Sequence, residues 1–294
     1  MPPHPYPLPT PITLIVATTP LPSSLPSSPS RLGIGLNGTL PWPRIKTDMS
    51  FFARVTARPP APPTRSGAGA VGKVRTNAVI MGRKTYDSIP PRLRPLGKRV
   101  NVVISRDLDG GVKGRVQGEL EGKLAREVEV RRTKEAEAQK EGQGQEGSIS
   151  TSISAPTQTT APNAATKDKS IEGQTNAFVS SSLDDALRTL DNAVESDEVG
   201  SIYVIGGAEI YASSLKIEKG RTVRIVMTDV ERVDGGEFEC DTFFPLDGGN
   251  LNGVWWRRVT PEEVSGWVGE EVSGEWVVEG DVRVRMVGYE RVDG

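Results

Sequence analysis

The stretch RLGIGLNGTLPWPRIKTDMSFFARVT, residues 31–56, decides how the rest of the chain is interpreted. It begins with glycines, passes through two prolines and ends in apolar residues at helical spacing, for which Thr47 is a suitable N-cap. Asp48 precedes Phe52 by one turn, so both can face one side of this helix. Asp48 could simply stabilise the helix N-terminus through the helix dipole. Its apolar neighbours and the preceding loop instead predict a lid over a pocket that contains one carboxylate, whose pKa burial would raise.

The glycines of this stretch match a dinucleotide-binding pattern only superficially. Residues 33–38, GIGLNG, have the spacing G-x-G-x-x-G. That fingerprint requires a strand before it and a helix that begins within it. A Pro/Ser-rich run precedes these glycines, and Pro41 and Pro43 prevent a helix directly after them. We therefore predict a flexible loop here.

Composition excludes several kinds of chemistry. The 294 residues include one cysteine, Cys240, and one histidine, His4, which lies in a Pro-rich tail. An intramolecular disulfide, a cysteine cluster for a metal and a histidine-dependent triad are therefore excluded, and no metal site is predicted. The formal net charge of −2 gives no general attraction to nucleic acid. Catalysis would have to depend on carboxylates, hydroxyls, Arg, Lys or a cofactor.

Buried strands and short helices alternate along most of the chain. Continuous apolar runs predict strands at 12–17, 77–81, 100–104, 176–180, 201–205 and 222–228, and alternating patterns predict antiparallel strands at 254–260, 276–279 and 282–289. A helix is expected from Arg83, and another after Ser182, which has capping-box spacing to Asp185. These elements predict a mixed α/β fold with a mainly parallel sheet.

Several segments have the composition of loops rather than of a packed core. We expect a Pro-rich tail at 1–11 and loop insertions at 18–30 and 58–73. Residues 108–175 should form a largely disordered insertion, although 119–140 could form a solvated helix. No apolar run is long enough to cross a membrane. Residues 1–47 lack acids, as transit peptides do, but a core strand at 12–17 favours the cytoplasm, with a mitochondrial pool as the alternative.

Two strand–glycine–helix junctions predict an anion site. Gly82 and the pair Gly206-Gly207 each follow a buried strand and precede a helix. Their helix N-termini should lie side by side at the carboxyl edge of the sheet, where a pyrophosphate would fit. Arg83 and Arg106 also follow strands and could hold an additional phosphate. This arrangement predicts NADP(H) rather than NAD(H).

The segments GIGLNGTLPWP, DMSFF, VIMGRKTYDSIP, RPLGKRVNVVISR, SLDDAL, VIGGAEIY and CDTFFP occur in the order seen in the dihydrofolate reductase family. The chain resembles the eukaryotic members of that family, with low-complexity insertions. The resemblance implies a single domain, residues 12–292, with an eight-stranded, mainly parallel sheet. It also implies NADPH as cofactor, 7,8-dihydrofolate as substrate, a monomer, and a role in one-carbon metabolism and thymidylate and purine synthesis.

The resemblance also assigns roles to individual residues, and implies a cis peptide between Gly206 and Gly207. The catalytic positions are Asp48, Trp42, Leu40 and Thr228. The substrate-binding positions are Asp48, Ile15, Met49, Phe52, Ile89, Leu93, Arg99, Ile205 and Tyr211, with Arg99 expected to pair with the glutamyl α-carboxylate. The cofactor-binding positions are Ala17, Ile34, Gly35, Gly38, Thr39, Gly82, Arg83, Lys84, Thr85, Ser105, Arg106, Gly206, Gly207, Ala208, Glu209 and Ile210.

Some positions depart from the family pattern. Asp48 stands where eukaryotic relatives usually have Glu, Thr39 where an acid is frequent, Tyr86 where Trp is frequent, and Leu93 where a polar residue often contacts substrate. Two alternatives remain open from the sequence. The first is a reductase of a riboflavin-pathway pyrimidine sugar phosphate on the same fold, and the second is a non-catalytic scaffold that binds a nucleotide or folate.

Overall fold

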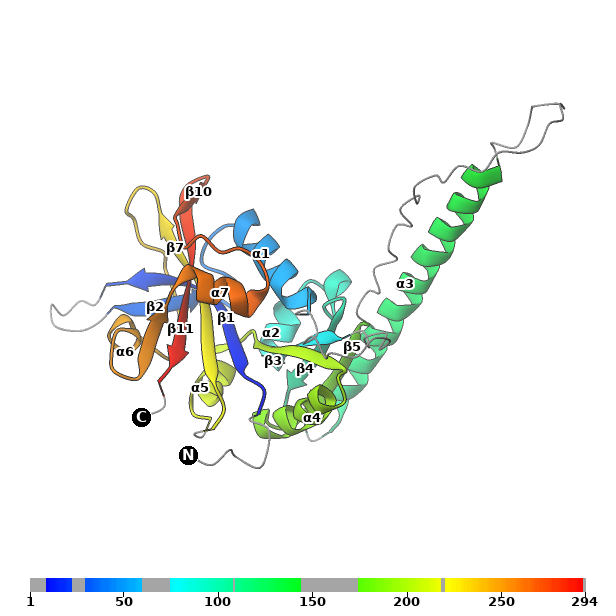
Figure 1. Ribbon diagram of the computed structural model, residues 1–294, viewed down its shortest axis with the longest axis horizontal. Coiled ribbons are helices and arrows are strands. Elements are labelled where there is room, and N and C mark those ends of the chain that lie inside the picture. The colour runs from blue at the N-terminus through cyan, green and yellow to red at the C-terminus, as the bar shows by residue number, and fades with distance from the viewer. Residues whose placement is uncertain are drawn as a thin grey trace, which may run out of the picture.

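The computed structural model describes residues 9–22, 30–59, 75–107, 109–143, 174–217 and 220–292. Its centre is a twisted sheet with helices on both faces (Figure 1). The strands are β1 (Ile12–Leu21), β2 (Arg31–Gly35), β3 (Thr76–Gly82), β4 (Arg99–Ile104), β5 (Asn176–Ser180), β6 (Val199–Val204), β7 (Val223–Arg232), β8 (Thr242–Phe243), β9 (Trp256–Val259), β10 (Val277–Glu279) and β11 (Val282–Arg291). The helices are α1 (Lys46–Ala57), α2 (Arg83–Ser88), α3 (Gly111–Gln143), α4 (Leu183–Glu195), α5 (Ala208–Leu215), α6 (Gly248–Leu251) and α7 (Pro261–Val268), with a 3₁₀ turn at Pro91–Leu93.

The main path of the sheet runs β10-β11-β7-β1-β6-β3-β4-β5. The pairings from β7 to β5 are parallel, and β11 returns antiparallel to β7. This confirms the predicted mixed α/β fold with a mainly parallel sheet. Within the described residues the sheet has 11 strands rather than the expected eight, because β2, β8 and β9 pair beside the main path.

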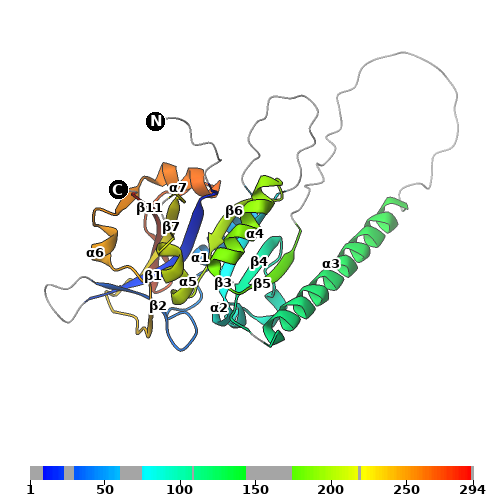
Figure 2. The same cartoon turned by 90° about the horizontal axis from the view of Figure 1, so that it is seen from below.

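The parallel strands are buried on both faces, which explains their continuous apolar sequences. On one face, Leu14 and Ile80 pack with Leu187 of α4 and Tyr211 of α5. The opposite face of the sheet packs against α1, α2, α7 and the first turns of α3. Figure 2 shows α4 and the outward course of α3 from a second side. Because helices cover both faces, the open positions for a ligand are the strand ends.

The first half of the glycine-rich stretch, residues 33–35, belongs to strand β2, which corrects the expected flexible loop, whereas Asn37 and Gly38 form a turn. Strand β1 continues to Leu21, so residues 18–21 of the expected loop insertion are also strand. Antiparallel pairing with β2 joins Thr19 to Gly33 and Leu21 to Arg31. A Cβ at Gly33 would lie 2.3 Å from the Cys240 sulfur, so glycine is required by this close approach rather than by a turn. Residues 23–29 and 60–73 lie outside the described residues, as do residues 1–8 of the tail.

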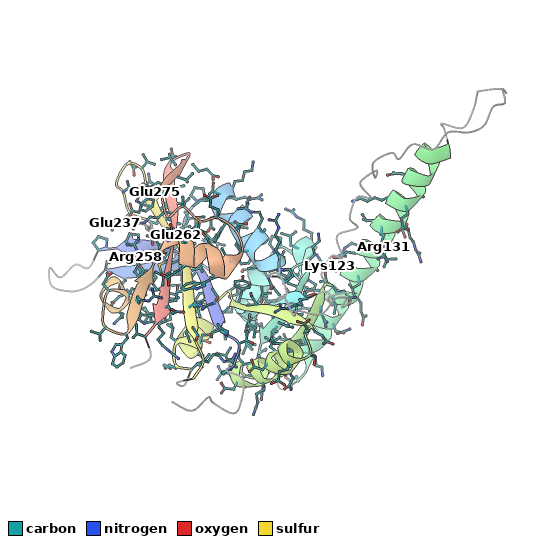
Figure 3. All side chains as sticks on the ribbon, in the orientation of Figure 1. Lys123, Arg131, Glu237, Arg258, Glu262 and Glu275 are labelled. Atoms are coloured by element: carbon teal, nitrogen blue, oxygen red, sulfur yellow. The ribbon has the colours of Figure 1, made fainter. Side chains whose placement is uncertain are left out.

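Helix α3 corrects the expectation of disorder for residues 111–143. Val116 and Leu120 are buried against α2 and β5, and Val112 precedes them by one turn. The Asp107 carboxylate accepts a hydrogen bond from the Val112 backbone N–H at 2.6 Å. The sequence pattern did not predict this packed helix, because the apolar stripe is short and a long charged segment follows it. Beyond it the helix projects from the body, where Arg131 lies (Figure 3). Residues 144–173 of the insertion lie outside the described part of the chain.

Two short helices near the C-terminus were not expected. Helices α6 and α7 both begin with a capping box, formed by Asp247 with Asn250 and by Thr260 with Glu263. In contrast, the predicted helix after Ser182 is present, and the Ser182 hydroxyl accepts a hydrogen bond from the Asp185 N–H at 3.1 Å. Among the helices in the described residues, none combines the length and apolar character needed to cross a bilayer.

Candidate active site

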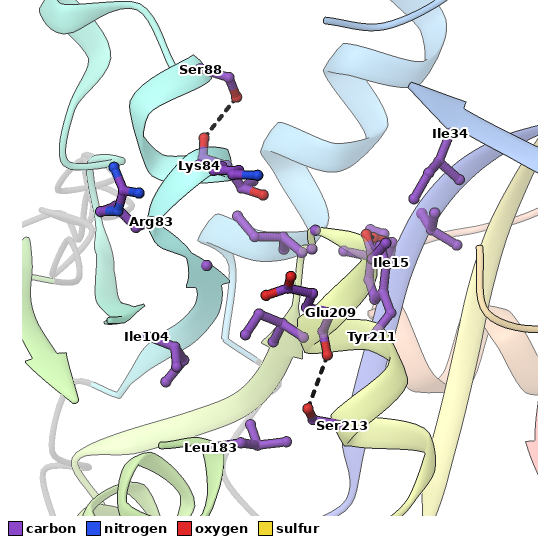
Figure 4. Close-up of a pocket in the computed structure, with 18 of the residues that line it drawn as sticks. Ile15, Ile34, Arg83, Lys84, Ser88, Ile104, Leu183, Glu209, Tyr211 and Ser213 are labelled. Carbon is purple, nitrogen blue, oxygen red and sulfur yellow. Dashed lines mark hydrogen bonds between the residues drawn. The ribbon is translucent and has the colours of Figure 1, made fainter. Parts of the chain in front are cut away.

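A cleft of about 2440 Å³ opens at the carboxyl ends of β1, β3, β4 and β6. Its walls come from α1, α2, α4 and α5, and from β2 with the loop that follows it (Figure 4). A pocket for one drug-sized ligand is typically about 300–1,000 Å³. The cleft therefore has room for two extended ligands side by side.

The two glycine junctions meet in the wall of this cleft. The Gly82 N–H donates a hydrogen bond of 2.8 Å to the Gly206 carbonyl, and the peptide between Gly206 and Gly207 is cis, as the resemblance implied. A Cβ at Gly207 would lie 3.2 Å from the Thr85 hydroxyl, and one at Gly82 would lie 3.2 Å from Ile210. Glycine is therefore required at both positions, because helices α2 and α5 pack closely together at this corner.

Backbone donors at this corner suit an anionic ligand. Helix α5 begins after Gly207, and no side chain caps it. The Ile210 N–H donates a hydrogen bond of 2.9 Å to the Gly207 carbonyl, and the helix dipole adds partial positive charge at this end of α5. Arg83, Lys84 and Arg106 line the same part of the cleft. The residues present consequently fit the phosphates of a dinucleotide cofactor.

One acid faces the substrate end of the cleft. Asp48 lies in the first turn of α1 and lines the cleft together with Thr228 of β7. Burial is the main cause that raises the Asp48 pKa, the Thr228 hydrogen bond opposes it, and the negative charge of Glu279 raises it further. Nearby, the Tyr211 hydroxyl donates a hydrogen bond of 2.8 Å to the Ile15 carbonyl. Asp48 is thus a half-buried acid whose carboxylate can accept hydrogen bonds from a ligand in the cleft.

The N-terminus of α1 is capped from another part of the chain. The N-cap residue is Ile45 and not the expected Thr47, and no N-cap side chain contributes. Instead the Glu279 carboxylate accepts hydrogen bonds from the backbone N–H groups of Lys46 at 2.5 Å and Thr47 at 2.8 Å. An acid from β10 therefore fixes the helix that carries Asp48.

Glu279→Ala should lower the melting temperature by about 2–4 °C, because both N–H groups lose their acceptor. These hydrogen bonds lower the Glu279 pKa, so the stabilisation is present above the unfolded pKa and is lost as pH falls through the folded pKa. The difference in melting temperature between wild type and Glu279→Ala should therefore disappear at acidic pH. Thermal melts across pH test this, with Glu275→Ala on an exposed neighbour as the control (Figure 3). Equal melting of wild type and Glu279→Ala at neutral pH would contradict the cap.

Two predicted residues lie behind the wall rather than on it. Trp42 is buried against Phe238, with ring centroids 6.0 Å apart, and its Nε1 has no hydrogen-bond partner among the described residues. Arg99 is also buried, and donates hydrogen bonds of 2.8 Å to the Thr56 hydroxyl and to the Gly97 and Ala53 carbonyls. The structure thus places both next to cleft-lining elements but not on the cleft surface.

The structure brings the remaining predicted site residues together around the cleft. They are Ile15, Ala17, Ile34, Gly35, Gly38, Thr39, Leu40, Asp48, Met49, Phe52, Gly82, Arg83, Lys84, Thr85, Ile89, Leu93, Ser105, Arg106, Ile205, Gly206, Gly207, Ala208, Glu209, Ile210, Tyr211 and Thr228. Sequence reasoning missed Leu187 and Arg188 of α4, and Asp107 and Val112 at the start of α3. The capped amphipathic pattern of α4 was visible, but nothing in it indicated the cleft.

Comparisons with known proteins indicate the class first: the chain is similar to oxidoreductases. In particular, it is similar to dihydrofolate reductase. A family model described as dihydrofolate reductase matches residues 72–137. Dihydrofolate reductase of Sus scrofa is 28% identical over 73% of this chain and 73% of its own length. Those of Heliothis virescens (25%, covering 89% and 92%) and Candida albicans (26%, covering 85% and 86%) also match. The predicted resemblance to dihydrofolate reductase is confirmed.

Proposed function

We propose that the protein reduces 7,8-dihydrofolate to 5,6,7,8-tetrahydrofolate with NADPH, and so supports one-carbon metabolism and thymidylate and purine synthesis. The observation that carries this proposal is the pairing of Asp48 with Thr228 inside a cleft that also contains the bare glycine corner. One end offers an acid for a flat heterocycle, and the other offers donors and cations for phosphates. We place this activity in the domain 12–292, acting as a cytoplasmic monomer.

The cofactor would lie along the glycine corner. Backbone N–H groups at the start of α5 and the side chains of Thr85 and Ser105 would hold its pyrophosphate and ribose, and Arg83 and Arg106 an additional phosphate. When bound, NADPH supplies the hydride that the substrate accepts. Ala17, which is half-buried in β1, and Leu40 in the exposed loop would border the nicotinamide ring.

Asp48 would hold the pterin ring and favour its protonation. Its carboxylate would accept hydrogen bonds from the pterin amino group and a ring nitrogen, and its negative charge would favour protonation at N5. A water would deliver the proton, and the resemblance assigns its positioning to Trp42, whose Nε1 lies behind the wall and has no hydrogen-bond partner among the described residues. Thr228 would keep the carboxylate oriented through a hydrogen bond from its hydroxyl, which also opposes the rise of the Asp48 pKa.

The rest of the substrate would cross the apolar mouth of the cleft. Phe52, Met49, Ile89 and Leu93 line it, and Leu93 and Met49 are exposed enough to contact a ligand. The Arg99 guanidinium lies 6.0 Å from the Phe52 ring centroid and contacts no acid among the described residues. A carboxylate at the edge of Phe52 would supply the missing negative charge.

The test is the loss of nicotinamide absorbance when dihydrofolate is added to the protein with NADPH. We expect turnover with dihydrofolate and none with a riboflavin-pathway pyrimidine sugar phosphate. Turnover with only the latter would support the alternative reductase. Calorimetric binding of NADPH and dihydrofolate without any turnover would identify a scaffold and overturn the proposal.

A further inference from the structure

The insertion helix α3 contacts the cofactor-binding helix α2 through charged side chains. The Arg115 guanidinium of α3 lies 2.8 Å from Oδ1 of Asp87 in α2. Arg83 lies one turn before Asp87 on the same helix, with its Nη1 3.5 Å from Oδ2 of Asp87. Arg94 approaches the same carboxylate at 3.6 Å. Asp87 is therefore shared by three arginines, and Arg115 is the nearest.

Arg83 and Arg115 differ in their relation to the cleft. Arg83 lines the cleft, and its side chain is labelled in the wall in Figure 4. Arg115 does not line it. Asp87 competes with any cofactor phosphate for Arg83, because both are anions within reach of one guanidinium. Each additional cation on Asp87 weakens that competition.

We propose that Arg115 determines the preference for NADPH over NADH by neutralising Asp87 and so leaving Arg83 available to the additional phosphate of NADPH. This inference rests on the proposed function, since it requires a nicotinamide cofactor in the cleft. NADH lacks that phosphate, so its binding does not depend on the charge at Arg83. The insertion thereby contributes to the cofactor site without touching the cofactor.

Arg115 is not needed to hold α3 in place. Val116 and Leu120 bury the apolar side of the helix. In addition, the Tyr86 hydroxyl donates a hydrogen bond of 2.6 Å to Glu119, which also pairs with Arg94 at 3.3 Å. The Arg115 side chain is 40% exposed, so its ion pair contributes little to folding. A substitution at Arg115 should leave a folded protein in which only the charge near Arg83 has changed.

Arg115→Gln should weaken NADPH binding about 3- to 5-fold and leave NADH binding unchanged. Calorimetric dissociation constants for both cofactors measure this directly, and kcat/KM with each cofactor gives a second readout. Arg131→Gln is the matched control, because it removes the same charge from the projecting part of α3 (Figure 3). The control should not change the NADPH/NADH ratio.

A double-mutant cycle tests whether Arg115 affects cofactor preference through Asp87. Asp87→Asn alone should raise the NADPH/NADH affinity ratio, because Arg83 loses its competitor, and Arg115→Gln should have no further effect in that background. The first of these results does not require Arg115→Gln to fold. Equal weakening of both cofactors would indicate a structural role and overturn the inference, as would an unchanged ratio in both single variants.

Failure of the proposed function would look different. If wild type binds NADPH more tightly than NADH but does not reduce dihydrofolate, the catalytic proposal fails while the cofactor ratios still test Arg115. If wild type binds neither cofactor, both proposals are overturned.

Discussion

Asp48→Asn should reduce turnover about 10²- to 10⁴-fold, with the largest loss at high pH. The amide cannot provide the negative charge that favours protonation of the substrate, and the described part of the cleft wall around Thr228 offers no second acid to replace it. At low pH, protons from solution compensate partly. The measurement is kcat/KM across pH for wild type and variant, with Asp281→Asn as an acid-to-amide control at an exposed position.

The same substitution should not destabilise the free protein. Burial raises the Asp48 pKa, so the folded protein holds this proton more tightly than the unfolded chain does. Wild-type stability therefore falls as pH rises from the unfolded pKa through the folded pKa. Above that window Asp48→Asn should melt at the same temperature as wild type or higher. Near-normal turnover in the variant would remove Asp48 from the proposed role, and a lower melting temperature would show that it supports the fold instead.

Arg99→Lys should raise the KM for dihydrofolate by roughly 10-fold or more, which is the effect of losing one hydrogen bond to a charged group. Burial lowers the Arg99 pKa to about 10, because it removes the guanidinium from water, and the acceptors that the guanidinium contacts are neutral. A carboxylate from the substrate would therefore gain a strong partner there. Lysine retains the charge but cannot reproduce the planar set of donors. Steady-state kinetics with varied dihydrofolate measures the change.

The matched control for Arg99 is a substrate without the glutamyl group. Dihydropteroate should show the same KM with wild type and Arg99→Lys, because it lacks the glutamyl α-carboxylate of this pair, and its benzoate carboxylate stands where dihydrofolate has the amide. The variant should also lose about 1–3 kcal/mol of folding stability for each buried carbonyl left without a donor. An equal increase in KM for both substrates would show that Arg99 supports the structure of α1 rather than substrate binding.

The sequence by itself determined the parallel core and the positions of the glycine corners. Residues such as Val79 and Ile80 are apolar in continuous runs because their strands are buried on both faces. Gly82 and Gly206 lie at the ends of such strands, so the topology of a parallel sheet brings them to one edge, where they share a hydrogen bond. Local pattern and topology were enough for these features, whereas the resemblance to a known family supplied most of the residues that line the cleft.

Tertiary structure alone decided the features that depend on partners far away in the chain. Glu279 caps the helix of Asp48 from a strand more than two hundred residues later, and Cys240 makes Gly33 necessary in a strand. Arg115 of the charged insertion helix α3 contacts helix α2 through Asp87. No periodicity encodes such contacts, because each depends on how separate elements meet in space. The sequence therefore specified which surfaces become buried, and three-dimensional packing specified which charges and backbone groups those surfaces bring into contact.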